Sequence, residues 1–368
     1  MNGLPSALLF PALAVLSAGL ALALIPVARA IGLVDHPGER KVHEKATPMT
    51  GGPAIFITLT LFIAWHLVDD RFAQALLAGG GLIFLAGLAD DRRHISPWVR
   101  FAVQVAACLF MVYWGGVYLV DFGRLFTGSV LELGPLYIPI TIFAALGVIN
   151  AFNMIDGMDG LSGGIFMVAA AGLALYAGFN GVVHLHWLLV AALFAVLGFM
   201  LLNARWPWNP RARVFLGDSG STLLGFLLAW SFIALGNEFN ESGQRAYMPM
   251  TAVWLIAVPL LDTATLIWRR WRRGESALAA DQHHLHHAFL RAGFSTVQAW
   301  FGIVGFAILL AGAGALFEAS SLPDALSFWA FIAVAFAYHL AMRRTWTIQR
   351  FLGRDFIYND FDNDTAND

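Results

Sequence analysis

The sequence has few charged residues and a single cysteine. Only 12% of its 368 residues are Asp, Glu, Lys or Arg, whereas a soluble domain has about 25%. This scarcity argues against an ordinary soluble protein, and the 59% of hydrophobic residues indicates a polytopic membrane protein. The one cysteine, Cys108, lies inside an apolar run, so a disulfide framework is excluded.

Several common sequence patterns are also missing. No G-x-x-x-x-G-K-[ST] loop occurs, so ATP-driven transport of the P-loop kind has no support. No Lys or Arg precedes the first apolar run, which argues against a cleaved signal peptide. We find no sequence repeat and no separate soluble domain. The net charge of −2 says nothing about partners, and no nucleic-acid partner is expected.

Long apolar runs fill most of the chain. A transmembrane helix needs roughly 17–25 mainly apolar residues, so we expect an all-α polytopic membrane protein, a bundle of about eleven transmembrane helices. We expect residues 1–342 to form one transmembrane domain and residues 343–368 a partly disordered cytoplasmic tail. The eleven windows are 5–27, 51–68, 72–89, 100–119, 135–150, 160–179, 185–202, 218–236, 248–268, 299–317 and 325–342.

The basic residues predict the orientation of these windows. If the windows alternate in direction, 19 of the 22 Lys and Arg residues fall on one side of the membrane, and only Arg71, Arg124 and Arg245 fall on the other. Cytoplasmic loops carry the excess of basic residues, so we expect a periplasmic N-terminus and a cytoplasmic C-terminus. The segments richest in polar side chains then all lie on the cytoplasmic face.

The segment from Asn150 to Gly160 is the most informative of these. It lies between two apolar windows and carries Asn153, Asp156 and Asp159 at a repeated three-residue spacing. If it is helical, these side chains share one side of the helix, at steps of about 60°. Such oxygen ligands suit Mg²⁺ or Mn²⁺, and beside a membrane span they need a cation, a partner or water. The alternative is a polar helix end that caps two spans.

A pair of carboxylates, Asp90 and Asp91, ends the third window. Adjacent carboxylates repel each other, which raises one pKa and suits a general base or a bound metal. The alternative is that Arg92, Arg93 and Arg100 neutralise them on a solvated loop.

The eighth window opens with VFLGDSGST, in which Asp218 is expected at or near a helix N-cap. Backbone N–H groups at a helix start favour phosphate, and a carboxylate there can hold a metal that bridges to the phosphate. The alternative is a plain Asp N-cap.

Three histidines, His284, His286 and His287, lie with Arg291 in the most basic cytoplasmic segment. Imidazoles and an arginine suit a pyrophosphate. Zinc is conceivable, but cysteine ligands are absent and the spacing matches no zinc pattern. The alternative is a surface histidine cluster.

Two further features remain open at this stage. The basic segment 40–52, which includes Lys45, looks like a loop folded over an anion, and lipid headgroup contact is an equal alternative. Asp262 lies inside the ninth window and needs a partner, although its role can be purely structural. Together, carboxylates, an amide, histidines and arginines on one membrane face describe metal-assisted phosphoryl transfer.

These motifs, in this order, resemble the polyprenyl-phosphate N-acetylhexosamine-1-phosphate transferase superfamily. The likeness extends from Gly32 to about Phe294, and QHHLHHAFLRAGF is most similar to its WecA type, the undecaprenyl-phosphate GlcNAc-1-phosphate transferases. The resemblance implies transfer of GlcNAc-1-phosphate from UDP-GlcNAc to undecaprenyl phosphate, with Mg²⁺ or Mn²⁺, giving undecaprenyl-pyrophosphoryl-GlcNAc and UMP. It also implies a multi-pass protein of the bacterial inner membrane, embedded in the lipid bilayer, and is compatible with a homodimer.

The resemblance also implies roles for individual residues. Asp218 and Asn153 would hold the metal on the UDP pyrophosphate. Asp90 and Asp91 would bind or deprotonate the lipid phosphate, and Asp159 would lie near the uracil. The implied catalytic residues are Asp90, Asp91, Asp156 and Asp159. The implied substrate-binding residues are Lys45, Asn150, Phe215, which would stack on uracil, His284, His286, His287 and Arg291.

Several alternatives stay open at this point. The same chemistry with another UDP-N-acetylhexosamine would use the same motifs, and so would either direct attack by the lipid phosphate or an acyl-phosphate on an Asp. A non-enzymatic transporter of lipid-linked sugars predicts carboxylates near the bilayer middle, whereas here nearly all lie at one surface. The downstream product would be a cell-surface polysaccharide such as O-antigen.

Overall fold

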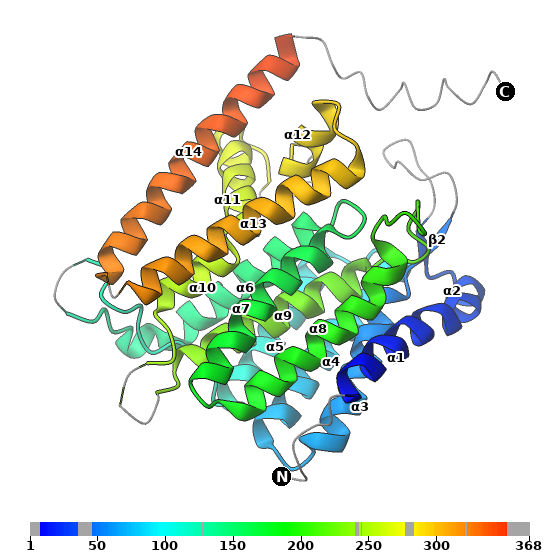
Figure 1. Ribbon diagram of the computed structural model, residues 1–368, viewed down its shortest axis with the longest axis horizontal. Helices are drawn as coiled ribbons and strands as arrows, with labels where there is room; N and C mark the ends of the chain where they lie inside the picture. The colour runs from blue at the N-terminus through cyan, green and yellow to red at the C-terminus, as the bar shows by residue number, and fades with distance from the viewer. Residues whose placement is uncertain are drawn as a thin grey trace.

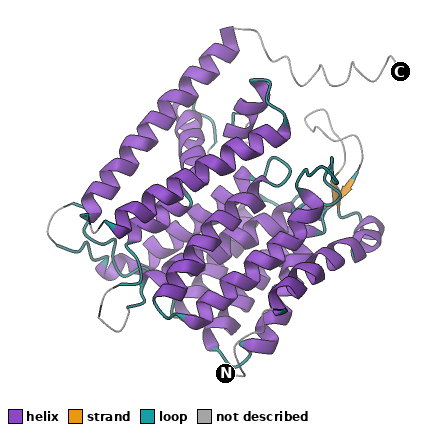
Figure 2. Ribbon diagram, viewed as in Figure 1, coloured by secondary structure: helices purple, strands orange, loops and turns teal. Residues whose placement is uncertain are grey.

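Nearly every apolar run folds into a helix, and the helices lie side by side in one bundle (Figure 1). The computed structural model describes residues 8–35, 46–126, 129–239, 243, 245–276, 283–320 and 322–351. Figure 2 shows how little of the chain is strand: one antiparallel pair, β1 (Val34–Asp35) with β2 (Thr47–Pro48).

The helices are named in chain order. The first half contains α1 (Leu9–Ala23), α2 (Ile25–Ile31), α3 (Gly51–His66), α4 (Arg71–Arg93), α5 (Pro97–Tyr113), the 3₁₀ turn η1 (Gly134–Leu136) and α6 (Tyr137–Ile155). The second half contains α7 (Leu161–Phe179), α8 (Val183–Asn203), α9 (Gly217–Gly236), α10 (Pro249–Leu255), α11 (Ala257–Arg272), α12 (Leu285–Arg291), α13 (Thr296–Ala319) and α14 (Asp324–Phe351).

Among the described residues, eight helical segments are long and apolar enough to cross a membrane, and a bent pair, α10 with α11, makes a ninth if it forms one span. The helices α3 and α5 are apolar but shorter. Nine of the predicted windows each coincide with one helix, the first covers α1 and the start of α2, and the ninth covers α10 and most of α11, which confirms the all-α polytopic fold. That α3 and α5 also cross the membrane stays a prediction.

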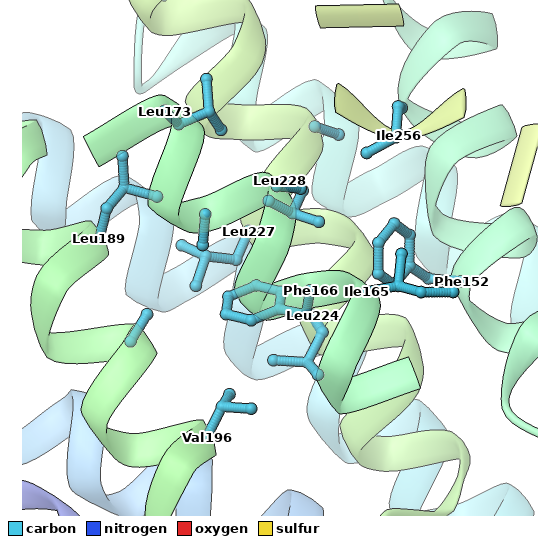
Figure 3. Packing of buried hydrophobic residues seen from close by; sticks show 14 of the residues in the cluster. Phe152, Ile165, Phe166, Leu173, Leu189, Val196, Leu224, Leu227, Leu228 and Ile256 are labelled. Atoms are coloured by element: carbon cyan, nitrogen blue, oxygen red, sulfur yellow. The ribbon is translucent and has the colours of Figure 1, made fainter. Parts of the chain in front are cut away.

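The helix α9 lies at the centre of the bundle, packed against α3, α4, α6 and α7. In the apolar stretch of α9, 89% of the residues are buried, whereas in that of the peripheral α14 only 17% are buried. Figure 3 shows Leu224, Leu227 and Leu228 of α9 among buried side chains of neighbouring helices. Because α9 has protein on nearly every side, the residues at its N-terminus are held by several elements at once.

Glycines allow α3 and α4 to approach α9 closely. A side chain at Gly52 would overlap the backbone of Gly220, and one at Gly87 would overlap the backbone of Ser219. Small residues at such contacts are the usual means of tight helix packing in a membrane. The close approach places the C-terminal end of α4 directly against the start of α9.

The ninth window is broken by a 79° bend between α10 and α11. The bend lies at Ile256, directly after Leu255, which is four residues before Pro259. A proline has no N–H for the carbonyl four residues earlier, and its ring clashes with that carbonyl. The proline therefore accounts for the position of the break, and α11 leaves the bundle in a new direction (Figure 1).

Two helix ends differ from the predicted windows. The helix α6 ends at Ile155, and Asp156 has a non-helical backbone with φ −77° and ψ 55°. Asp156 and Asp159 therefore lie in a loop, and the expected helical face shared with Asn153 is wrong. At the other end of the chain, α14 continues past residue 342 to Phe351, and the remainder of the tail lies outside the described residues.

Candidate active site

The start of α9 is bound by a carboxylate from another helix. Asp91 of α4 accepts hydrogen bonds from the backbone N–H groups of Asp218 (2.6 Å) and Ser219 (3.1 Å) and from the Ser219 hydroxyl (2.7 Å). The N-cap position belongs to Leu216, which has no side-chain cap. Asp218 is thus in the first turn and is not the N-cap itself, and its carboxylate is left for other partners.

The Asp218 carboxylate is held between an amide and a guanidinium. One oxygen accepts from the Asn153 amide at 2.7 Å, and the other lies 3.3 Å from Arg100. The Asn153 amide also donates to the Ser221 hydroxyl at 3.1 Å. This arrangement joins the end of α6 to the start of α9, as expected for Asn153 and Asp218 acting together.

Asp90 and Asp91 point to different partners. Asp90 is buried and accepts from Arg100 at 2.6 Å and from the Ile95 backbone N–H at 2.8 Å. Arg100 therefore bridges Asp90 and Asp218. The alternative of neutralisation on a solvated loop is right about the pairing of Asp90 with Arg100 and wrong about the loop, because Asp90 is buried within α4. Arg92 and Arg93 are exposed. Separate partners explain how two adjacent carboxylates can lie at one helix end.

Asp156 is the carboxylate with an uncompensated charge. It accepts no hydrogen bond from any described residue. Burial, followed by the nearby carboxylates of Asp218, Asp91 and Asp159, raises the pKa of Asp156 well above its ordinary value. A cation or a proton is needed to relieve this concentration of negative charge.

Asp159 is paired with Arg205 at 2.8 Å, a partner that the sequence did not reveal. The next residue, Gly160, is fixed twice: its N–H donates to Asn203 and its carbonyl accepts from Trp300. Asp159, Arg205 and Trp300 line a small pocket between the 204–206 loop and the start of α13. The loop that follows Asp156 is therefore held from both sides.

The histidine segment is anchored by Asp262. One Asp262 oxygen lies 2.8 Å from His284 Nδ1, and the other accepts from the Leu285 backbone N–H and the Tyr338 hydroxyl, both at 2.9 Å. The three histidine rings of α12 and its N-cap lie together, with His286 and His287 centroids 4.1 Å apart. This contact satisfies Asp262 and confirms that it needs a partner.

His286 packs against the loop that contains Asp156. A side chain at Gly157 would overlap the His286 ring. The ring is buried, and neither of its nitrogens has a hydrogen-bond partner among the described residues. Burial, followed by His287, His284 and Arg291, lowers the pKa of His286 well below its ordinary value. A buried, neutral imidazole without a partner next to a crowded carboxylate indicates a place for a polar ligand.

Some candidate residues have partners outside the carboxylate cluster, and others lie outside the described residues. The Asn150 amide donates to Gln104 and to the Leu146 carbonyl, so it is engaged within the bundle. The Phe215 ring packs on an apolar cluster near β2. Lys45 and most of the basic loop around it lie outside the described residues. The substrate contacts of these residues and of Arg291 stay predictions.

The donor set fits a divalent cation that shares its ligands with a substrate. Among the residues that the structure describes, no three His, Cys, Asp or Glu side chains form a metal-holding group by themselves. Mg²⁺, however, is usually bound by one or two carboxylates together with water and substrate phosphates. Asp218 and the amide oxygen of Asn153 would hold it, with the charge of Asp156 close by.

Several residues of this site were missed by sequence reasoning. Arg205 and Tyr338 gave no signal, because an arginine in a basic loop and a tyrosine in an apolar window are ordinary. Ser219 follows Asp218 in the motif VFLGDSGST and was given no role of its own, yet its hydroxyl donates to Asp91. Each of these contacts joins segments that are far apart in the sequence.

The chain is similar to known proteins over most of its length. A family model described as glycosyl transferase family 4 matches residues 73–236. The undecaprenyl-phosphate alpha-N-acetylglucosaminyl 1-phosphate transferase of Escherichia coli (strain K12) is 36% identical over 331 residues, which cover 89% of this chain and 88% of the relative. The proteins of that name from Salmonella typhi (36%, over 89% of this chain and 88% of the relative) and Haemophilus influenzae (34%, over 89% and 92%) are similar along nearly their whole length.

The match therefore extends well beyond the family model and includes the histidine segment and α13. Identity of this order over almost the full length of both chains is enough to assign the family. The chain belongs to the undecaprenyl-phosphate alpha-N-acetylglucosaminyl 1-phosphate transferases, within glycosyl transferase family 4.

Proposed function

We propose that this protein transfers GlcNAc-1-phosphate from UDP-GlcNAc to undecaprenyl phosphate and releases UMP. The observation that carries the proposal is the convergence of Asp90, Asp91, Asn153, Asp156 and Asp218 at one end of the bundle. In the reaction, an oxygen of the lipid phosphate bonds to the phosphorus next to GlcNAc, and the bond from that phosphorus to the UMP oxygen breaks. The negative charge of three phosphates makes cationic support essential.

We assign the divalent ion, Mg²⁺ or Mn²⁺, to Asp218 and Asn153. When bound, it would neutralise charge on the pyrophosphate and on the departing UMP. Support comes from the excess of carboxylates at the site and from the raised pKa of Asp156. Arg100, which contacts Asp90 and Asp218, supplies fixed positive charge beside them.

The protein groups then divide between positioning and reaction. Asp90 and Asp91 have their oxygens engaged with Arg100 and with the start of α9, so they hold the site in shape. Asp156 accepts no hydrogen bond from the described residues and has a raised pKa, which suits a group that takes up a proton from the lipid phosphate. His286, on the other side of Gly157, is available to a phosphate or sugar oxygen.

The site is proposed to face the cytoplasm of a bacterial inner membrane. It lies at the C-terminal ends of α4 and α6 and at the N-terminal end of α9, where most arginines also lie. A water-soluble nucleotide-sugar would arrive from that side, and undecaprenyl phosphate would reach the site from the surrounding bilayer. The product would enter the synthesis of a surface polysaccharide such as O-antigen.

The test is an assay of the purified full-length protein with radiolabelled UDP-GlcNAc and vesicles that contain undecaprenyl phosphate. We expect UMP release together with a labelled, butanol-soluble lipid, and both should stop when EDTA removes the metal. The Asp218→Asn variant should be inactive, whereas Arg29→Gln, an exposed change at the end of α2, should retain activity. Preference for UDP-GalNAc would change the sugar assigned, and absence of UMP release with every UDP-sugar would reject the proposal.

A further inference from the structure

Asp262 is a buried carboxylate inside an apolar helix, and three groups from two other elements, α12 with its N-cap and α14, supply its hydrogen bonds. Asp262 of α11 is 1% exposed, and His284 and Tyr338 are each 7% exposed. Its oxygens are bound by His284 Nδ1, the Leu285 N–H and the Tyr338 hydroxyl of α14. A carboxylate in this setting is costly unless all its lone pairs are satisfied. Here they are satisfied by the segment that carries the site histidines.

The helix α12 depends on this contact for its position. It has seven residues, and its N-cap His284 provides no side-chain cap. Isolated helices of this length are unstable in water, so the backbone N–H of Leu285 needs a partner at the start of the helix. Asp262 is that partner, and it binds the backbone and the His284 ring at the same time.

The same contact sets the state of the His284 ring. A carboxylate can only accept, so the ring nitrogen that faces it, Nδ1, carries the proton. The proton stays on Nδ1 whether the ring is neutral or charged. The other nitrogen, Nε2, is therefore left for contacts other than Asp262, and such an outer carboxylate commonly fixes both tautomer and ring orientation.

The geometry points to Asp262 as a positioning residue for phosphoryl transfer, acting through His284. The inference rests on the proposed function: it assigns His284 Nε2 to an oxygen of the phosphate groups that react. The His284 ring stacks on the His286 ring, with centroids 5.4 Å apart and 18° between the planes. His286 in turn packs against the loop that contains Asp156. Tyr338 extends the arrangement to α14, so the last helix of the bundle helps to hold the site.

The decisive variant is Asp262→Asn. The Asn oxygen can still accept from Leu285 and Tyr338, which preserves the cap, but its NH₂ group would face His284 and force the proton onto Nε2. We expect kcat to fall roughly 10- to 100-fold, the usual effect of removing such an outer partner, while KM for UDP-GlcNAc changes less than about threefold. The matched control is Asp121→Asn, the same chemical change at a carboxylate that pairs with Arg245 and has no contact with the histidine segment; its activity should stay within about threefold of the wild type.

A second readout does not depend on activity. In ¹⁵N-histidine-labelled protein in nanodiscs, the ring resonances of His284, assigned by their loss in His284→Gln, should show the proton on Nδ1 in the wild type and on Nε2 in Asp262→Asn. A wild-type ring protonated only on Nε2, or full kcat in Asp262→Asn, would overturn the inference. If the wild type releases no UMP, the proposed function fails, while the ring spectrum still decides the tautomer. If Asp262→Asn does not fold, two other measurements decide. The wild-type spectrum should still show the proton on Nδ1, and the kcat of His284→Gln should fall by a similar factor of roughly 10 to 100.

Discussion

Asp91 binds Ser219 twice, through its backbone N–H at 3.1 Å and its hydroxyl at 2.7 Å. The two residues lie on different helices, and the contact fixes the start of α9 against the end of α4. Because Asp218 is the residue before Ser219, its carboxylate is placed by the same contact.

Gly217→Ala should disturb the contact between Asp91 and α9. Gly217 has φ +74°, and a β-carbon there would lie 2.5 Å from an Asp91 oxygen. We expect an activity loss of at least tenfold and a lower Tm, since backbone strain alone costs roughly 1–2 kcal/mol. The control is Gly116→Ala, which has φ +68° and no atom within 4 Å. It should show the strain in Tm but keep full activity; equal activity of the two variants would contradict the prediction.

The ionisation of Asp156 predicts that divalent cations stabilise the protein more at higher pH. Its raised pKa means that the ion-free protein loses stability as pH rises through that value, whereas below the ordinary Asp pKa of about 3.9 the contribution is fully present. A cation should cancel this loss, at about 1.4 kcal/mol for each pKa unit reversed. We expect Mg²⁺ or Mn²⁺ to raise Tm more at about pH 8 than at about pH 5.5.

The measurement is thermal unfolding with EDTA or with the cation across this pH range. In Asp156→Asn the cation effect should vary less with pH than in the wild type, because one of the titrating carboxylates is gone. A cation effect in the wild type that does not vary with pH would show that Asp156 stays protonated or lies too far from the ion.

Gly157→Ala should displace His286 without changing the bundle. The added methyl group would overlap the ring, which is buried and has little space to move. Misplacement of a binding group by about 1 Å can reduce activity on the order of a hundredfold, so we expect a loss between tenfold and a hundredfold. Gly147→Ala is the matched control on α6, because nothing lies within 4 Å of that position. Steady-state rates of UMP release and Tm would be compared.

The ion pair between Asp121 and Arg245 should stabilise the fold and leave catalysis unchanged. The pair is bidentate, with distances of 2.8 and 2.6 Å, and it follows the C-terminal end of α5, away from Arg100 at the other end of that helix. Hydrogen bonds from Arg245 lower the pKa of Asp121, so this stabilisation is present above the ordinary Asp pKa and is lost as pH falls through the depressed value.

We expect Asp121→Asn to cost about 1.5–3 kcal/mol, the usual range for hydrogen bonds to charged groups, with UMP release unchanged at temperatures well below Tm. Denaturant or thermal unfolding at neutral pH measures the cost. A strong loss of activity in the folded variant would mean that the two ends of the bundle are coupled.

The sequence was enough to predict the helices, because apolar runs of spanning length leave few other structures. It also predicted that Asn153 and Asp218 belong to one site, and the two side chains are in contact. It could not predict that α6 ends before Asp156, since Met and Ile there are compatible with a longer helix. Helix ends depend on which partners the backbone finds in the folded protein.

The partners of the charged residues were the least predictable part. Asp218 has the sequence context of an N-cap, yet Asp91 provides the cap. Asp262 gave only the expectation of a partner, and the partner came from His284, 22 residues later, and Tyr338, 76 residues later. Such pairings follow from how helices pack, and local sequence patterns do not predict which helices pack against each other.

The burial of α9 has a consequence for turnover. A helix enclosed by four others cannot shift without disturbing the whole bundle, so Asp218 is carried by the most rigid element available. Any movement that admits a bulky nucleotide and releases its products should then occur in elements other than α9. If entry and release limit turnover, the rate should be sensitive to substitutions in those other elements and insensitive to changes that only tighten the packing around α9.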